Sequence, residues 1–208
     1  MTDLGTTSLP ADNVSSTTYM RSRLVDLPLD MSFMNLSTIE DLVAIPEPRP
    51  VGSKGQAPRR NEDDKFMTRV IRLNNNFFAD LSKFQGVMES IMAEPLLISW
   101  IDFSFNSLPK IDHVFCQFRN LQILYLHGNA IMKLSEVDKL IELPHLTKLT
   151  LHGNPIENDK SYRLYVLTRV PQLKNFDMTA VTRGDRVTAD VWQKNMPIKK
   201  KPRRSSDL

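Results

Sequence analysis

The stretch Leu121-Gln-Ile-Leu-Tyr-Leu-His-Gly-Asn129 decides the fold, because its pattern returns as Leu146-Thr-Lys-Leu-Thr-Leu-His-Gly-Asn154. Both stretches follow the template L-x-x-L-x-L-x-x-N. A third full copy spans Ile98 to Asn106, and degenerate copies span Thr68 to Asn76 and Leu173 to Val181. The asparagines at 76, 106, 129 and 154 lie 23 to 30 residues apart. Such regular spacing indicates a stack of repeats rather than chance similarity.

The template predicts a specific geometry for each repeat. Its L-x-L segment is a short strand, in which alternate side chains point into the core. The Asn then turns inward, where its amide bonds backbone groups of its own and neighbouring turns, because an unpaired buried amide costs about 1–3 kcal/mol. No turn closes its own hydrophobic face, so each needs neighbours or a cap. The sequence therefore predicts an α/β solenoid of about five turns, with a parallel β-sheet on the concave face and helices on the convex face.

Apolar residues at helical spacing predict the convex helices. One stripe runs from Leu81 to Ala93, a second begins at Ser135, and a third, more aromatic one follows Asn158. A last helix begins at Thr182. We expect this helix to lie across the open end of the final turn.

Composition divides the chain into five parts. Residues 1–30 are rich in Ser, Thr, Asp and Asn and predict a disordered arm. Residues 31–60 hold one short helix, announced by capping-box spacing, and a Pro/Gly-rich linker. The solenoid is predicted over residues 61–181 and the capping helix over 182–196. Residues 197–208 form a basic tail that we expect to be disordered.

The bulk composition excludes several classes of protein. Of the 208 residues, 41% are hydrophobic and 25% charged, which is typical of a globular chain. The single cysteine, Cys116, cannot form an internal disulfide, which favours a reducing compartment. No apolar run approaches the roughly 20 residues of a membrane span, and Met1 to Pro10 lack the apolar core of a secretory signal. We therefore expect a soluble, intracellular protein without a membrane partner.

The net charge of +3 is a property of the C-terminus. From residue 194 onward six basic residues face one acid, so this segment carries +5 and residues 1–193 carry −2. The body lacks the basic excess typical of nucleic-acid-binding domains, so we do not expect nucleic acid as the main partner. The tail can be interpreted as a nuclear-import signal, a polyanion-binding segment or a solubilising terminus. Its basic residues are Lys199, Lys200, Lys201, Arg203 and Arg204.

These repeats resemble the short, intracellular SDS22-like class of leucine-rich repeats, and the run from Tyr162 to Asp177 resembles the C-terminal cap of that class. The resemblance implies a cytoplasmic, non-enzymatic interaction protein. We expect it to be a small subunit of a ciliary or cytoskeletal assembly, with an axonemal or microtubule-associated partner. A nuclear ribonucleoprotein or chromatin adaptor and a phosphatase-regulatory subunit stay open as alternatives.

Residues between the inward-facing positions of each strand should point to the concave surface and align in columns. Trp100, Ile123 and Tyr125 would then form an apolar and aromatic cluster bordered by charges. Interface hot spots favour such side chains within a polar rim. We expect a protein partner here, unless the chain's own N-terminal arm covers the face. The predicted partner-binding residues are Val70, Arg72, Trp100, Asp102, Ile123, Tyr125, His127, Lys148 and His152.

Metal and catalytic sites are not expected. His127 and His152 hold equivalent places on adjacent strands, about 4.8 Å apart, but a structural zinc site takes four ligands and repetition alone explains the pair. Cys116 and His113 are only neighbours at i and i+3, as for a half-buried convex cysteine. The sequence has no Gly-rich phosphate loop, G-x-S-x-G elbow or H-E-x-x-H motif. We expect no enzyme, no cofactor and no small-molecule substrate.

Overall fold

The computed structural model describes residues 27–44 and 47–195. The basic tail and most of the predicted N-terminal arm lie outside these described residues. Within them, the strands form one sheet in chain order, with β1 to β6 parallel and β7 antiparallel to β6. The strands are β1 (Leu29–Asp30), β2 (Val70–Arg72), β3 (Trp100–Asp102), β4 (Ile123–Tyr125), β5 (Lys148–Thr150), β6 (Asn175–Phe176) and β7 (Thr179–Ala180).

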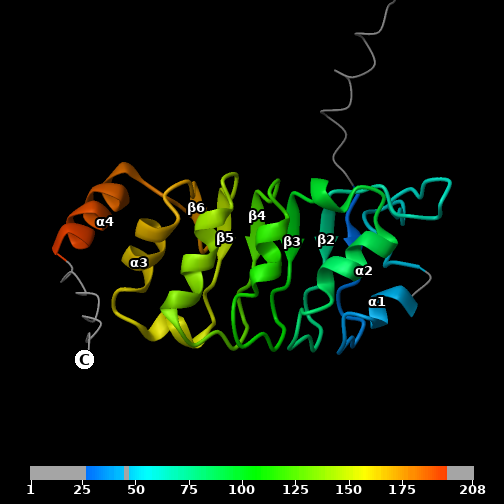
Figure 1. The fold of residues 1–208 in the computed structure, drawn as a ribbon, viewed down its shortest axis with the longest axis horizontal. Helices are drawn as coiled ribbons and strands as arrows, with labels where there is room; N and C mark the ends of the chain where they lie inside the picture. The colour runs from blue at the N-terminus through cyan, green and yellow to red at the C-terminus, as the bar shows by residue number, and fades with distance from the viewer. Residues whose placement is uncertain (1–26, 45–46, 196–208) are drawn as a thin grey trace, which may run out of the picture.

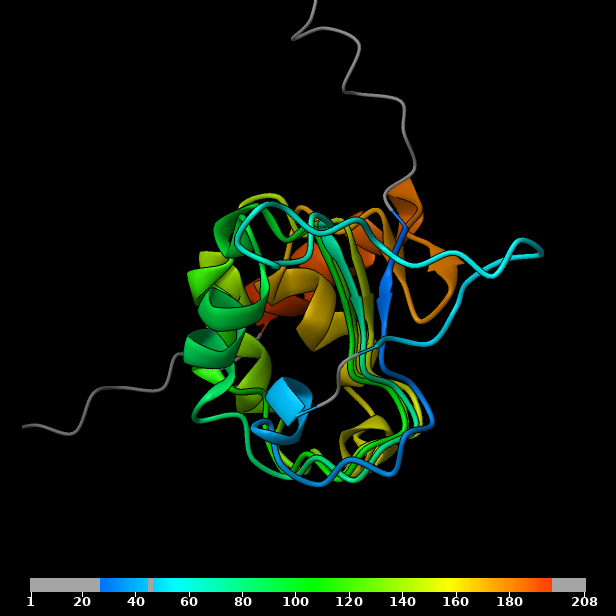
Figure 2. The same ribbon diagram turned by 90° about the vertical axis from the view of Figure 1, so that its right-hand side faces the viewer.

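Helical segments connect successive strands. Figure 1 shows the turns stacked side by side, and Figure 2 shows α2, α3, η3 and η4 gathered on one side of the sheet. The α-helices are α1 (Asp41–Ala44), α2 (Phe84–Ile91), α3 (Tyr162–Arg169) and α4 (Arg183–Asn195), and the 3₁₀ helices are η2 (Pro95–Leu97), η3 (His113–Gln117), η4 (Leu134–Glu142) and η5 (Pro155–Asn158). None of the helices in the described part of the chain has the length and apolar character needed to cross a membrane.

The core lies between the sheet and the helices. Leu124, Leu126, Leu149 and Leu151 are all 0% exposed, as the period-two pattern predicts. Edge-to-face phenylalanine rings fill the space between β3 and the convex segments, at positions 78, 84, 103, 115 and 118. The predicted α/β solenoid with a parallel sheet is therefore confirmed.

The template asparagines form the predicted ladder. In each, Oδ1 accepts a hydrogen bond from a backbone N–H of the preceding turn, and Nδ2 donates to carbonyls of both turns. For Asn154, the N–H of Ile131 donates at 3.0 Å, and the carbonyls of Leu126 and Leu151 accept at 2.9 and 2.8 Å. The ladder thus ties neighbouring turns together inside the stack. Its members are Asn76, Asn106, Asn129 and Asn154.

The N-terminal boundary predicted at residue 30 is wrong. Leu29 and Asp30 form β1, which pairs in parallel with β2 and adds a turn before the five read from the sequence. Leu29 and Met31 are buried, and Asn76 closes this turn by accepting hydrogen bonds from the N–H groups of Met34 and Leu36, both at 3.1 Å. A few apolar residues therefore suffice to order this part of the arm, because the second turn supplies the missing asparagine.

The C-terminal end departs from the template. Phe176 is buried as predicted, but Met178 is 56% exposed, because Asp177 and Met178 take left-handed φ angles of 48° and 61° and turn the chain into β7. Helix α4 then begins at a capping box, in which Thr182 Oγ1 accepts from the Asp185 N–H at 3.1 Å. It packs beside α3 at this end of the stack (Figure 1).

Candidate binding face

The concave columns predicted from the repeat spacing are present in the sheet. One column aligns Val70, Trp100, Ile123 and Lys148, and the next aligns Arg72, Asp102, Tyr125 and Thr150. His127 and His152 follow two residues after the second column on β4 and β5. The nine residues predicted to contact a partner therefore share one side of the sheet. Their role in binding stays a prediction.

Aromatic side chains form a continuous series of contacts across β3, β4 and β5, here called the aromatic ladder. Trp100 meets Tyr125 edge-to-face at 5.8 Å between ring centroids, and Tyr125 meets His127 at 6.1 Å. Phe105 meets His127 at 5.0 Å, and His127 stacks on His152 at 4.6 Å with only 10° between the ring planes. Edge-to-face pairs of this kind stabilise their mutual orientation by about 0.5–1.5 kcal/mol. The ladder is therefore a prearranged surface rather than a set of independent side chains.

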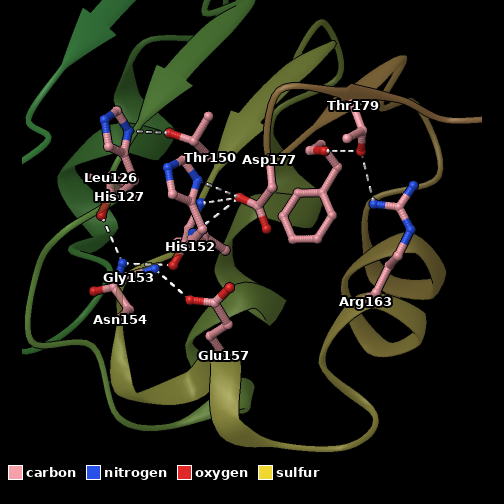
Figure 3. A network of polar contacts seen from close by, with 12 residues as sticks. Leu126, His127, Thr150, His152, Gly153, Asn154, Glu157, Arg163, Asp177 and Thr179 are labelled. Atoms are coloured by element: carbon pink, nitrogen blue, oxygen red, sulfur yellow. Dashed lines mark hydrogen bonds and ion pairs between the residues drawn. The ribbon is translucent and has the colours of Figure 1, made fainter.

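A polar contact at Nδ1 holds each of the two histidine rings in place (Figure 3). Nδ1 of His127 shares a hydrogen bond of 2.8 Å with Thr150 Oγ1, and the Nδ1–H of His152 donates to Asp177 Oδ1 at 3.3 Å. Burial, followed by the neighbouring His152, lowers the pKa of His127 below its ordinary value. His127 is therefore neutral near pH 7.

Asp177 contacts the aromatic ladder at its C-terminal end, beside His152. Its Oδ1 accepts hydrogen bonds from the backbone N–H groups of Leu151 at 2.7 Å and His152 at 3.0 Å, and its Oδ2 accepts from the Tyr162 hydroxyl at 2.7 Å. Burial and this carboxylate raise the pKa of Tyr162. Asp177 therefore holds both the end of β5 and the His152 ring in place.

Two phenylalanines on this side of the sheet were not predicted. Phe33 and Phe105 adopt φ angles of 57° and 53°, the left-handed conformation that Gly128 and Gly153 adopt at the equivalent repeat position. A bulky L-residue pays roughly 1–2 kcal/mol for this conformation, yet the two rings are 62% and 53% exposed. The sequence signal was the alignment of Phe105 with the glycines of the later repeats. Exposed aromatic rings held in strained backbone mark candidate contact residues.

Each of these phenylalanines ends a repeated D-x-S-F phrase, Asp30-Met-Ser-Phe33 and Asp102-Phe-Ser-Phe105. In both copies Asp Oδ1 accepts from the N–H and hydroxyl of the Ser two residues later. Arg72 lies on the strand between them, and its Nη1 pairs with Asp30 Oδ2 at 3.1 Å. Asp102 is buried, so it contributes charge beneath the face rather than contact surface.

Two buried polar atoms on these columns are unsatisfied. Among the described residues, the buried side-chain N or O atoms without a hydrogen-bond partner are Trp100 Nε1 and Asn74 Oδ1. Asn74 lies in line with Ser104 and His127 across the sheet. Such atoms cost about 1–3 kcal/mol each when left unpaired. Both atoms lie beneath the concave surface, so a polar group of a partner would meet them only after a local rearrangement.

The described residues of the N-terminal segment, 27–33, do not cover this face. Residues 27–33 lie along the β2 edge of the sheet, where the N–H of Met31 donates to the carbonyl of Arg72 at 2.8 Å. The segment at 47–60 and the hairpin of β6 and β7 project beyond the sheet on the side away from the helices, one near each end of the stack (Figures 1 and 2). Within the described part of the chain, these two segments lie on either side of β3, β4 and β5 and do not cross them.

The stacked parallel strands, the buried asparagine ladder and the convex helices define a leucine-rich repeat solenoid. Residues 106–201 match the family model described as "Leucine-rich repeat". The chain is 47% identical over 197 residues to leucine-rich repeat-containing protein 51 of Mus musculus, covering 94% of this chain and 100% of that protein. The Homo sapiens protein of the same name is 46% identical over 184 residues, covering 88% and 93%. The chain therefore belongs to the leucine-rich repeat family of leucine-rich repeat-containing protein 51.

A solved structure shares the fold. The crystal structure of the Drosophila melanogaster SNF/U2A' complex matches with a TM-score of 0.56 and 21% identity, covering 79% of each chain. At this identity the match concerns the fold alone. Leucine-rich repeat proteins of this kind are typically non-enzymatic protein-interaction modules.

Proposed function

We propose that this chain is a non-enzymatic interaction module that holds a protein partner on the aromatic ladder, as a small subunit of a ciliary or cytoskeletal assembly. The family supports protein binding in general, and the Drosophila structure that shares the fold is that of a complex, SNF/U2A'. The concave face supplies the more specific support.

The observation that carries the proposal is Phe105. Its ring lies so close to Gly128 that a Cβ atom at that glycine would stand 2.7 Å from the ring, and it contacts His127 edge-to-face. The backbone beneath it is left-handed, and half of the side chain faces solvent. Folding alone does not favour this arrangement, since glycine serves the same turn in the next two repeats without strain. A contact between this ring and a protein partner would explain why the exposed phenylalanine is kept at this position.

The polar groups around the ladder would select the partner. Lys148 is exposed on β5, beside Ile123. Arg72 lies on β2, at the opposite end of the aromatic ladder, where it is half-buried and paired with Asp30. Rim charges of this kind set association rate and orientation more than affinity. The aromatic centre would provide most of the binding free energy, as interface cores rich in Trp and Tyr do.

A comparative pull-down tests the binding face. The double variant Trp100→Asp and Tyr125→Asp places charge in the centre of the ladder, whereas Met132→Asp and Ile141→Asp place the same charge on exposed residues elsewhere on the solenoid. We expect a defined set of proteins to be captured by wild type and by the control, and to be lost from the ladder variant. If the ladder variant retains every captured protein, the concave face is not the binding surface.

The ciliary part of the proposal is tested by cell fractionation. The chain, tagged and expressed in ciliated cells, should copurify with demembranated axonemes and leave them only when the ladder is substituted. Recovery entirely in the soluble cytosol of ciliated cells, with binding partners unrelated to the cytoskeleton, would reject that assembly while leaving the interaction module intact.

A further inference from the structure

A second chemical cluster lies on the helical side of the solenoid. His113 and Cys116 belong to η3, and Glu142 ends η4 in the following turn. One ligand atom from each, an imidazole nitrogen, the Cys116 sulfur and a carboxylate oxygen, lie within 4.8 Å of one another. The sequence showed only the i and i+3 relation of the first two residues. The stacking of turns supplies the third.

Backbone geometry places the first two ligands on one side of η3. In a 3₁₀ helix, residues three apart are eclipsed, so His113 and Cys116 project in the same direction. Asp112 caps this helix at its N-terminus, where its carboxylate accepts a hydrogen bond from the Val114 N–H at 2.9 Å. The cluster therefore rests on a capped and ordered segment.

Side-chain contacts fix the spacing between the two turns. The Cys116 thiol donates to the Lys139 carbonyl at 3.3 Å, and Arg119 Nη1 donates to the Glu142 carbonyl at 2.6 Å. In the other direction, Lys139 Nζ donates to the Ile111 carbonyl at 2.8 Å. These three bonds join η3 and the residues that flank it to η4, and they fix the spacing of the two segments that carry the ligands.

We propose that His113, Cys116 and Glu142 form a binding site for a divalent transition-metal ion of the zinc class, with water as the fourth ligand. Thiolate and imidazole select borderline and soft ions such as Zn²⁺ over Mg²⁺ and Ca²⁺, which prefer oxygen ligands. Three protein ligands leave one position open, unlike a closed structural site. On binding, the Cys116 S–H bond breaks, its proton passes to solvent and the sulfur electron pair is shared with the metal.

The distances are close to what such an ion requires. Tetrahedral bonds of about 2.0–2.1 Å put neighbouring nitrogen and oxygen ligands about 3.3 Å apart. The His113 Nε2 to Glu142 Oε1 distance is 4.0 Å, and both side chains are exposed enough to rotate inward. Cys116 is buried and already directed toward η4. Closing the site requires His113 and Glu142 to rotate inward and the Cys116 thiol to release the Lys139 carbonyl.

The two anionic ligands match the charge of the bound ion. Arg119 faces the cluster, with its Nη2 at 3.8 Å from Glu142 Oε2, and Lys139 is already paired with Glu136 at 2.6 Å. With the thiol ionised, Cys116 and Glu142 contribute two negative charges, which neutralise a divalent ion. Because the ion would bridge η3 and η4, its binding should stabilise the stack of turns.

Cobalt(II) titration of the reduced, tag-free full chain tests the site. Cys116 is the only cysteine in the sequence, so any thiolate-to-cobalt charge-transfer absorption must come from it. We expect that band together with the strong visible absorption of tetrahedral cobalt, and its loss when one equivalent of Zn²⁺ is added. Absence of both bands at saturating Co²⁺ would overturn the proposal.

Matched variants separate ligation from folding. His113→Gln alters an exposed side chain and should weaken Co²⁺ binding at least tenfold with an unchanged circular-dichroism spectrum. His145→Gln, which removes an exposed histidine outside the cluster, should bind Co²⁺ as wild type does. If His113→Gln keeps wild-type affinity, or if both variants weaken binding equally, the three-residue site is wrong. Zn²⁺ should also raise the melting temperature of wild type and of His145→Gln, but not of His113→Gln.

Discussion

Replacing Asn129 by leucine tests the buried asparagine ladder. The Asn129 side chain is buried, its Oδ1 accepts from the Leu108 N–H at 3.0 Å, and its Nδ2 donates to the carbonyls of Phe103 and Leu126, both at 2.9 Å. Leucine has a similar size but can make none of these bonds. The variant leaves buried backbone groups of two turns without partners.

The cost follows from those contacts. Three net hydrogen bonds at about 1 kcal/mol each give a loss of about 3 kcal/mol. The added apolar surface of leucine returns about 1 kcal/mol. The expected decrease in the free energy of unfolding is therefore about 2 kcal/mol, which corresponds to a decrease of about 4–8 °C in melting temperature for a domain of this size.

Urea and thermal unfolding followed by far-ultraviolet circular dichroism measure this difference. Asn158→Leu is the matched control, because Asn158 is exposed and its Nδ2 makes a 3.3 Å bond to the Pro155 carbonyl within its own turn. The control should stay within about 0.5 kcal/mol of wild type. Equal unfolding midpoints for Asn129→Leu and wild type would refute the reasoning that the amides hold the turns together.

Three further outcomes follow from the same structure. Phe105→Gly should change the free energy of unfolding by less than about 1 kcal/mol, because relief of the left-handed strain offsets the lost ring contacts. The same variant should no longer capture the partner. If it still captures the partner, Phe105 is not part of the binding face. The pKa of His127 is lowered in the folded state, which therefore resists protonation of this ring, so the free energy of unfolding should decrease as the pH drops below about 6.5. The melting temperature of His127→Gln should depend less on pH over this range. The same pH dependence for the variant and for wild type would contradict the burial of the ring. Deletion of residues 197–208 should leave the chain's distribution in cells unchanged, whereas loss of a nuclear pool would favour the nuclear-adaptor alternative.

Much of the fold and of the candidate face could be predicted because the repeat fixes the register. Once the leucines of two copies are aligned, the period of two determines which residues face the core and which lie beside one another on the concave side. Trp100, Ile123 and Lys148 align in the sheet for that reason. The asparagine ladder could also be predicted from the sequence, because a buried side-chain amide needs hydrogen-bond partners in the neighbouring backbone.

The remaining features depend on contacts between segments that the template does not describe. The turn that begins with β1 lacks the template asparagine, and it is closed instead by hydrogen bonds that the N–H groups of Met34 and Leu36 donate to Asn76 of the following turn. The conformation of Phe105 was hidden because an aromatic residue rarely takes a glycine position. The proximity of Glu142 to Cys116 follows from the offset of η4 against η3, which spacing along one helix cannot reveal.

Photocrosslinking from the aromatic ladder most directly tests whether this ladder is the binding surface. A photoreactive phenylalanine analogue would be placed at Tyr125 and, in a matched variant, at the exposed Ile141. After irradiation in cells, we expect a covalent adduct of defined mass from position 125 that is absent from position 141 and is lost with Phe105→Gly. An adduct of the same mass from position 141, with none from position 125, would show that the aromatic ladder is not the binding surface.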